Sequence, residues 1–219
     1  MKNNTKSGFF PIFINLNKFP CLIVGGGKVA YRKVQSLLDF KANITVISPK
    51  FCKPLIELAK ANKIKIINKS YSKENIKNFK IVVCATNNEN INKTVYSDCV
   101  KEDILINVVD KPLLCDFIMP ANVKRGDLTI SVSSQGKAPF YVKVIKKKLE
   151  AIISPKYGEI IQLASKFRNH ILINSKTKSA NTKAKMFRKF TSINWENILA
   201  EKGKRNSYKE VQKILDELN

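Results

Sequence analysis

The stretch Leu22-Ile23-Val24-Gly25-Gly26-Gly27-Lys28-Val29-Ala30 decides the fold of this 219-residue chain. An apolar strand runs into three glycines and then into a helix, an arrangement suited to holding a diphosphate. Gly25 permits a tight turn, Gly27 lets the backbone approach a pyrophosphate, and Ala30 lets the helix pack close to the strand. The stretch therefore predicts a dinucleotide cofactor, bound by Gly25, Gly26, Gly27, Lys28 and Val29.

The residues around the glycines decide how much weight the motif carries, because a glycine cluster alone is more typical of an ordinary turn. Residues 19–24 form a short apolar run that predicts a buried strand. Behind Lys28, apolar residues recur at helical spacing, and Arg32 and Lys33 are expected on the outer side of that helix. Strand and helix are both predicted, so we prefer the dinucleotide site to the plain turn.

The first half of the chain alternates between predicted strands and helices. Such alternation is typical of a parallel sheet with helices on both faces. An apolar segment at 11–16 is expected to form a hairpin-like pair with the strand at 19–24. We predict an α/β fold with a Rossmann-like, doubly wound parallel sheet, whose later strands lie at 43–47, 64–67, 80–85 and 104–109.

Polar residues follow several predicted strands, and the carboxyl ends of parallel strands are where such sheets bind ligands. Thr86 and Asn87 follow one strand, and Asp110 follows another. We expect these three side chains to converge on the cofactor. An aspartate shortly before Pro112 is also typical of a turn cap, so a structural role for Asp110 stays open.

The pattern changes after Pro112, where strands at 117–123 and 128–132 are joined by a turn at 124–127. Helices are expected from there on, and the polar stretch 174–181 is the best linker candidate. We predict a Rossmann-like domain at 1–113, a small α+β segment at 114–152 and a helical C-terminal region at 153–219. The expected helices lie at 139–153, 157–172, 183–190 and 207–218.

Lysine and arginine outnumber acidic residues by 40 to 17, which gives a formal net charge of +23. Such a charge attracts polyanions, among them nucleic acids. The excess is spread along the chain, because residues 1–140 carry 22 basic and 10 acidic side chains and residues 141–219 carry 18 and 7. This distribution argues against a single nucleic-acid groove and suits a small substrate with many carboxylates.

The five cysteines are widely spaced and form no C-x-x-C pair, so we predict neither a zinc knuckle nor a disulfide framework. With His170 as the single histidine, no histidine-based metal constellation forms within one subunit. No apolar stretch reaches the length of a bilayer span, and residues 1–9 lack the apolar core of a secretory signal. We expect a cytoplasmic protein with reduced thiols, no resident metal and no membrane partner.

Four segments together resemble the precorrin-2 dehydrogenases, the sirohydrochlorin-forming proteins that also occur as the first part of multifunctional siroheme synthases. The resemblance covers roughly residues 10–150 and is far more specific than the glycine motif alone. The segments are Pro11-Ile12-Phe13, Val24 to Lys33, Ala85-Thr86-Asn87-Asn88, and Asn107-Val108-Val109-Asp110 through Phe117-Ile118-Met119-Pro120-Ala121 to Ser131-Val132-Ser133-Ser134-Gln135-Gly136-Lys137-Ala138-Pro139.

The resemblance implies NAD-dependent oxidation of precorrin-2, a tetrapyrrole polycarboxylate, to sirohydrochlorin in siroheme biosynthesis. It also implies a homodimer, with residues 114–152 as the dimerisation segment. The key acid of the family falls at Asp110, where a carboxylate accepts a proton as hydride leaves the macrocycle. Ser134 aligns with a serine near the active site, and Lys124 and Lys137 are expected near the carboxylates of the substrate.

The cofactor site departs from the common NAD pattern, in which an acidic residue about 20 positions past the glycines binds the ribose hydroxyls. Ser48, Pro49 and Lys50 stand there instead, and we expect them to contact the cofactor. NAD is the cofactor that the resemblance implies. Lys50 leaves room for the 2′-phosphate of NADP.

Two alternatives stay open. In a bifunctional version the same site would also insert iron into sirohydrochlorin, as in some members of the family, although the lack of ligands speaks against ferrochelatase activity. A protein of another class would be a dinucleotide-sensing regulatory or nucleic-acid-binding module that uses the basic helical end. No zinc finger, aromatic RNA-binding signature or helix-turn-helix accompanies the lysines at 143–148, which disfavours this second alternative.

Overall fold

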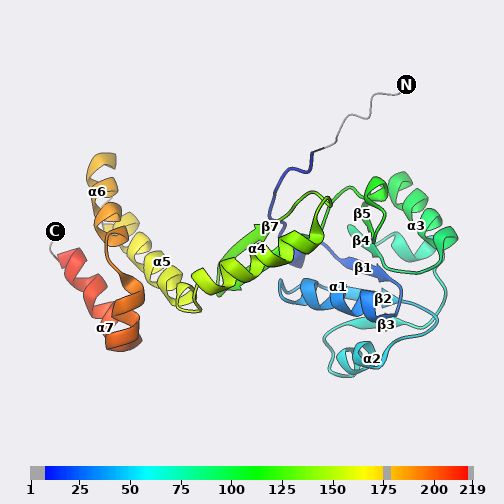
Figure 1. The fold of residues 1–219 in the computed structure, drawn as a ribbon, viewed down its shortest axis with the longest axis horizontal. Coiled ribbons are helices and arrows are strands. Elements are labelled where there is room, and N and C mark those ends of the chain that lie inside the picture. Colours follow the sequence, from blue (N-terminus) through cyan, green and yellow to red (C-terminus); the bar gives the residue numbers. More distant parts are fainter. Residues whose placement is uncertain (1–7, 175–178, 217–219) are drawn as a thin grey trace. The chain divides into compact units, whose positions relative to one another are not determined.

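The computed structural model describes residues 8–174 and 179–216 and divides the chain into two units, Met1–Met119 and Pro120–Asn219. The described part of the first unit holds a five-stranded sheet, and that of the second holds a two-stranded sheet and helices (Figure 1). The three-part division at residues 113 and 152 stays a prediction.

The strands of the larger sheet are all parallel and follow the order β3-β2-β1-β4-β5. The chain moves outward from β1 through β2 to β3, then crosses back to β4 and β5 on the other side of β1. The strand order therefore reverses between β1 and β4, and such a topological switch point is where open α/β sheets bind ligands. The strands are β1 Cys21–Val24, β2 Ile44–Ile47, β3 Lys65–Ile67, β4 Ile81–Cys84 and β5 Leu105–Val108.

Helices cover both faces of this sheet, as predicted for a doubly wound fold (Figure 1). Successive residues of β1 point to opposite faces. Cys21 and Ile23 pack in one core with residues of α1 and α2, whereas Leu22 and Val24 pack in the other core with residues of α3. The helices of this unit are α1 Lys28–Leu38, α2 Lys53–Lys60 and α3 Glu89–Lys101, with 3-10 turns at Leu16–Lys18, Lys73–Ile76 and Pro112–Leu114.

The hairpin-like pair expected from residues 11–16 and the first strand is wrong. Residues 11–15 form no strand, and Leu16–Lys18 is a 3-10 turn. The reason is that β1 is the central strand: it pairs with β2 on one side and with β4 on the other, so neither edge is free. Instead, Ile14, Leu16 and Phe19 pack against the core that β1 shares with α1 and α2.

The second unit begins with an antiparallel hairpin of β6 (Ala121–Arg125) and β7 (Leu128–Val132). Gly126 turns between the strands with φ of +58°. Helix α4 (Pro139–Ile152) packs against β6, and the Arg125 guanidinium donates to the carbonyls of Glu150 and Ile153 at the carboxyl end of that helix. The bounds of β7 are those predicted, α4 ends one residue earlier than predicted, and β6 begins four residues and ends two residues later.

The remaining helices form a separate aromatic core in which the ring of Phe190 lies between those of Phe167 and Trp195, at centroid distances of 4.9 and 4.6 Å. The predicted last helix begins too late, because a helical stretch already starts at Trp195 and is broken at Gly203, whose φ is +67°. Part of the predicted linker, 175–178, and residues 217–218 of that helix lie outside the described residues. These helices are α5 Tyr157–Asn174, α6 Ala180–Thr191 and α7 Trp195–Asp216.

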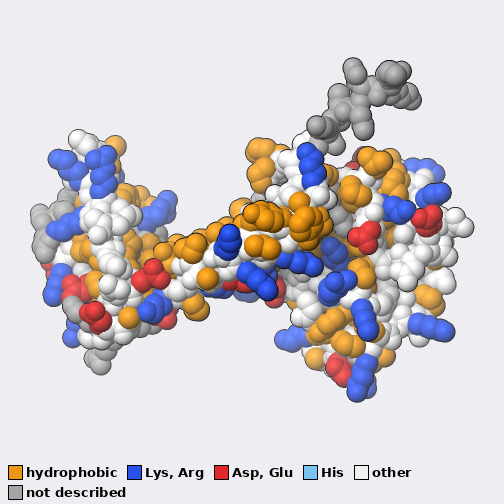
Figure 2. Space-filling view, viewed as in Figure 1, with side chains coloured by type: hydrophobic (Ala, Val, Ile, Leu, Met, Phe, Trp, Pro, Cys, Tyr) orange, Lys and Arg blue, Asp and Glu red, His pale blue; other side chains and the backbone are white. Residues whose placement is uncertain are grey.

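All five cysteines lie in the described part of the chain, and all are free thiols. Burial raises the pKa of Cys21 to about 11 and those of Cys84 and Cys99 to about 12, so these thiols are unreactive near neutral pH. Figure 2 shows lysine and arginine side chains scattered over the visible face without a single basic patch. Among the described helices, none has the length and apolarity needed to cross a bilayer.

Candidate functional site

A cavity of ≈ 750 Å³ opens at the carboxyl end of the parallel sheet, where β1 and β4 diverge into their loops. Segments that follow four different strands line it, as expected for a ligand site at a switch point. The lining segments are Gly25–Gly27 after β1, Ser48–Cys52 after β2, Ser70–Tyr71 after β3 and Ala85–Asn88 after β4.

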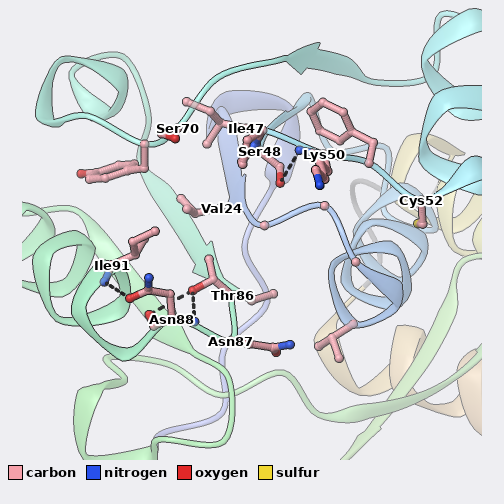
Figure 3. Close-up of a pocket in the computed structure, with 18 of the residues that line it drawn as sticks. Val24, Ile47, Ser48, Lys50, Cys52, Ser70, Thr86, Asn87, Asn88 and Ile91 are labelled. Carbon is pink, nitrogen blue, oxygen red and sulfur yellow. Dashed lines mark hydrogen bonds between the residues drawn. The ribbon is translucent and has the colours of Figure 1, made fainter.

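The structure brings all ten predicted cofactor-binding residues to this cavity. Figure 3 shows Ser48 and Lys50 on one side of the glycine turn and Thr86 and Asn87 on the other. The sheet topology explains this arrangement, because β2 and β4 flank β1 and their carboxyl ends point the same way. The ten residues are Gly25, Gly26, Gly27, Lys28, Val29, Ser48, Pro49, Lys50, Thr86 and Asn87.

Each glycine of the turn has its own geometric requirement. Gly25 has a φ of +120°, and a Cβ there would stand 2.5 Å from the carbonyl oxygen of Ala85. A Cβ at Gly26 would collide with the carbonyl oxygen of Lys50. A Cβ at Gly27 would meet nothing within 4 Å, so this glycine faces open space beside the cavity.

The start of α1 suits an anion. The first backbone hydrogen bond of the helix runs from Tyr31 N to Gly27 O, and the amides before it have no intrahelical acceptor. No acidic residue stands in the first turn. The charged residues among those lining the cavity are Lys28 and Lys50, both cationic, so an electropositive turn and free amides fit the diphosphate of a dinucleotide.

Thr86 is held from behind by Asn92, a buried residue of α3 that the sequence analysis did not identify. The Thr86 hydroxyl donates to Asn92 Oδ1 at 2.6 Å, and Asn92 Nδ2 donates to the Thr86 carbonyl at 3.2 Å. The helical spacing of Asn92 with Val95 and Cys99, which are both buried, was the available signal. A polar residue in an otherwise buried stripe needs a partner there.

Asp110 lies at the same edge of the sheet but does not line the cavity. Cys84 and Val108 are partners in the register of β4 and β5, so Asp110 stands level with Thr86, two residues past the end of each strand. Its side chain is exposed and its φ is +61°. The 3-10 turn that follows has Lys111, not Asp110, as its N-cap residue.

Lys33 was expected on the outer side of α1, and this expectation is wrong. The side chain is half-buried, and it lies close enough to Asp110 and Cys115 for their charges to act on it. Burial lowers the pKa of Lys33, while the charge of Asp110 opposes that change. Lys33 is three residues after Ala30 and four before Leu37, both buried, so its spacing already put it near the inner face.

The residues expected near the substrate lie in the second unit. Ser134 is half-buried, and its hydroxyl accepts a hydrogen bond from the Ala138 amide at 2.9 Å, just before α4. Lys124 in β6 and Lys137 before α4 are exposed. Across residues 8–174 and 179–216, no three His, Cys, Asp or Glu side chains gather as metal ligands would.

Comparison with known proteins gives a family model described as "Putative NAD(P)-binding", which matches residues 12–121. The chain is also similar to a solved structure named SirC, precorrin-2 dehydrogenase, with a TM-score of 0.75 and 25% identity. That similarity covers 94% of this chain and 100% of the other. The match includes the sheet, the hairpin and the helices that follow.

Curated relatives are named siroheme synthase. One from Ruthia magnifica subsp. Calyptogena magnifica is 40% identical over 194 residues, which cover 89% of this chain and 40% of the relative. Another, from Pseudoalteromonas translucida (strain TAC 125), is 40% identical over 163 residues, or 74% of this chain and 34% of the relative. This chain therefore spans well under half the length of these relatives.

Proposed function

This chain belongs to the NAD(P)-binding family whose model matches residues 12–121, and on that premise we propose that it oxidises precorrin-2 to sirohydrochlorin with NAD as hydride acceptor, a step of siroheme biosynthesis. The observation that carries the proposal is the cavity at the switch point, with its glycine turn and free helix amides. The names of the structural neighbour and of the curated relatives supply the substrate class.

Dehydrogenation of the macrocycle removes one hydride and one proton. When bound, NAD supplies the hydride acceptor. The amides at the start of α1 bind the pyrophosphate, and Thr86 and Asn87 orient the cofactor at the end of β4. An Asp110 carboxylate oxygen accepts the proton from the macrocycle as the hydride departs, because Asp110 lies at the same sheet edge as Thr86 and its side chain is open to solvent.

Charge supports a polycarboxylate as substrate. A formal net charge of +23 draws polyanions toward the protein, and the substrate is expected to use cationic contacts at Lys124 and Lys137. We also propose that Ser134 lies near the bound substrate. We do not propose Arg125 as a contact for the substrate carboxylates, because its guanidinium donates hydrogen bonds to the carbonyls at the end of α4.

The partner in the proposal is a second copy of the chain. One face of α4 carries large apolar side chains at helical spacing, namely Phe140, Tyr141, Val144 and Ile152, with 72% of Phe140 and 68% of Ile152 exposed. Figure 2 shows hydrophobic side chains along this segment. A self-complementary apolar face of this kind is typical of a homodimer interface. Sedimentation of the wild type and of Phe140→Glu tests it: a dimer that becomes a monomer is expected.

Incubating the purified protein with precorrin-2 and NAD tests the proposed reaction. We expect NADH, read at its absorbance band, to form in step with sirohydrochlorin. A folded protein that binds NAD without turning over precorrin-2 would instead favour a dinucleotide-sensing module. A parallel incubation with sirohydrochlorin and ferrous iron, without NAD, measures whether siroheme forms faster than in the absence of protein. Cytoplasmic location remains a prediction consistent with the free thiols.

A further inference from the structure

Asn92 is buried in α3, at 7% exposure, and does not line the cavity. Its side-chain amide nevertheless holds the segment that forms one wall of that cavity. From this arrangement we propose that Asn92 is a positioning residue for the cofactor: it fixes Thr86 at the end of β4, and through Thr86 it sets the wall against which NAD binds. The inference rests on the proposed cofactor role of the cavity.

Side-chain hydrogen bonds of Asn92 go to residues at and just after the end of β4. Its Oδ1 accepts from the Thr86 hydroxyl at 2.6 Å and from the Cys84 thiol at 3.1 Å, and its Nδ2 donates to the Thr86 carbonyl at 3.2 Å. One side chain thus binds both the main chain and the side chain of Thr86. This double contact fixes the Thr86 hydroxyl in one rotamer.

Thr86 in turn forms a hydrogen bond with Asn88, two residues further along the chain. Its hydroxyl oxygen accepts from the Asn88 amide at 3.2 Å, and Asn88 in turn caps α3 by accepting from the amides of Asn90 and Ile91. Figure 3 shows the bonds of Asn88 to Thr86 and to Ile91 beside the cavity. In the chain, Asn87 stands between the two bonded residues Thr86 and Asn88. Asn87 is therefore presented to the cavity from a segment that is tied at both ends.

The same segment is confined from the opposite side by the glycine turn. The Ala85 amide donates to the Val24 carbonyl at 2.8 Å, and the Ala85 carbonyl lies against Gly25, where even a Cβ would be too close. Movement toward the turn is therefore blocked, and movement away breaks the bonds to Asn92. The Ala85–Thr86 segment is therefore held by contacts with both the glycine turn and Asn92.

Stability alone does not require an asparagine here. Of the other buried positions of α3, Val95 and Cys99 are apolar and Asp98 is polar, and an apolar side chain at 92 would avoid burying an amide. Both polar atoms of the amide have partners instead: Oδ1 accepts from Thr86 and Cys84, and Nδ2 donates to the Thr86 carbonyl. A satisfied buried polar group next to a binding site is typical of a residue that gives a loop one defined conformation.

The test is a double-mutant cycle on NAD affinity, measured by calorimetric titration of the full chain. Asn92→Ala and Thr86→Val are each expected to raise the Kd for NAD about tenfold, the effect of one lost hydrogen bond in a binding site. The double variant is expected to bind no more weakly than the weaker single variant, because the two residues act through one contact. Asn90→Ala, an exposed asparagine of the same helix, is the matched control and should keep the wild-type Kd.

Asn92→Asp serves where the alanine variant does not fold: it keeps the shape and an acceptor but removes the donor to the Thr86 carbonyl, and it should also raise the Kd. In turnover assays the KM for NAD should rise while kcat at saturating NAD changes little. Variants of Asn92 or Thr86 that bind NAD as the wild type does, or effects that multiply in the double variant, overturn the inference alone. A folded wild type that binds no NAD overturns the proposed function and the inference with it.

Discussion

Lys33 of α1 is half-buried and Asp110 after β5 is exposed, and the negative charge of Asp110 acts on the Lys33 ammonium group. Burial lowers the pKa of Lys33, and the negative charge of Asp110 partly reverses that change. The proposed proton acceptor therefore has a cationic neighbour contributed by the helix that follows the glycine turn.

Asp110→Asn should lower kcat for precorrin-2 oxidation by about 10²–10⁴-fold, the range expected for loss of a general base. The Kd for NAD should stay at the wild-type value, because Asp110 does not line the cavity. Asparagine is chosen because it tolerates the φ of +61° at this position, so the fold is kept. Steady-state kinetics and NAD titration provide the two measurements. An unchanged kcat would remove Asp110 from the chemistry.

Lys33→Met should raise the Tm at pH 7, because a charged group no longer has to be held in a half-buried position. The lowered pKa means that the folded protein binds fewer protons than the unfolded chain between that pKa and 10.5, the ordinary lysine value. The stability of the wild type should therefore rise with pH across that window relative to Lys33→Met. Thermal unfolding of both proteins should show a smaller difference in Tm between Lys33→Met and the wild type at pH 10 than at pH 7. A difference that widens with pH would contradict the burial of this ammonium group.

The parts of the fold that depend on local pattern could be predicted. The apolar run at 80–85 predicted β4 (Ile81–Cys84), because a buried strand is signalled by residues close in sequence. The absence of a hairpin before β1 could not be predicted from such local patterns. Whether β1 can pair with a preceding segment depends on which strands pair with its two edges. One of them, β4, lies about 60 residues further along the chain.

The residues of the candidate site likewise fall into those that the sequence predicts and those that only the folded structure reveals. The ten residues at the cavity follow predicted strands or belong to the glycine motif, and a parallel sheet brings such positions together. Asn92 and Lys33 were missed because their surroundings exist only in the folded chain: Asn92 bonds to Thr86, and Lys33 is half-buried within reach of the charge of Asp110. Helical spacing with buried neighbours was the available signal for both residues, but it does not say which groups a polar side chain contacts there.

Lys50 should make the cavity accept NADP as well as NAD. Among the described residues that line the cavity, none is acidic and would repel a 2′-phosphate, and Lys50 stands after β2, where dinucleotide sites contact the ribose. Lys50→Asp is expected to raise the Kd for NADP at least tenfold and to change that for NAD far less, and the wild-type affinity for NADP should fall more steeply with salt. Titration of both cofactors at two salt concentrations measures this. Equal losses for NAD and NADP would show that Lys50 does not face the ribose.

Gly26 and Gly27 should respond in opposite ways to the same added methyl group. Gly26→Ala places a Cβ into the Lys50 carbonyl and against the Ser48 side chain, and both belong to the segment after β2. Because the Gly26 carbonyl also accepts from the Cys52 amide at 2.8 Å, the turn has little freedom to yield. We expect a loss of about 3 kcal/mol in the free energy of unfolding, at the upper end for overpacking.

Gly27→Ala is the matched control for stability and the test for binding. Its φ of −87° and ψ of −173° suit alanine, and the new Cβ meets no protein atom within 4 Å, so the Tm should stay within a degree or two of the wild type. The methyl group would instead occupy the space in front of the free amides of α1, where the pyrophosphate is proposed to lie, and should raise the Kd for NAD about tenfold or more. Thermal unfolding and NAD titration on the two variants separate the effects. A Gly27→Ala protein that keeps both its Tm and its NAD affinity would place the diphosphate elsewhere.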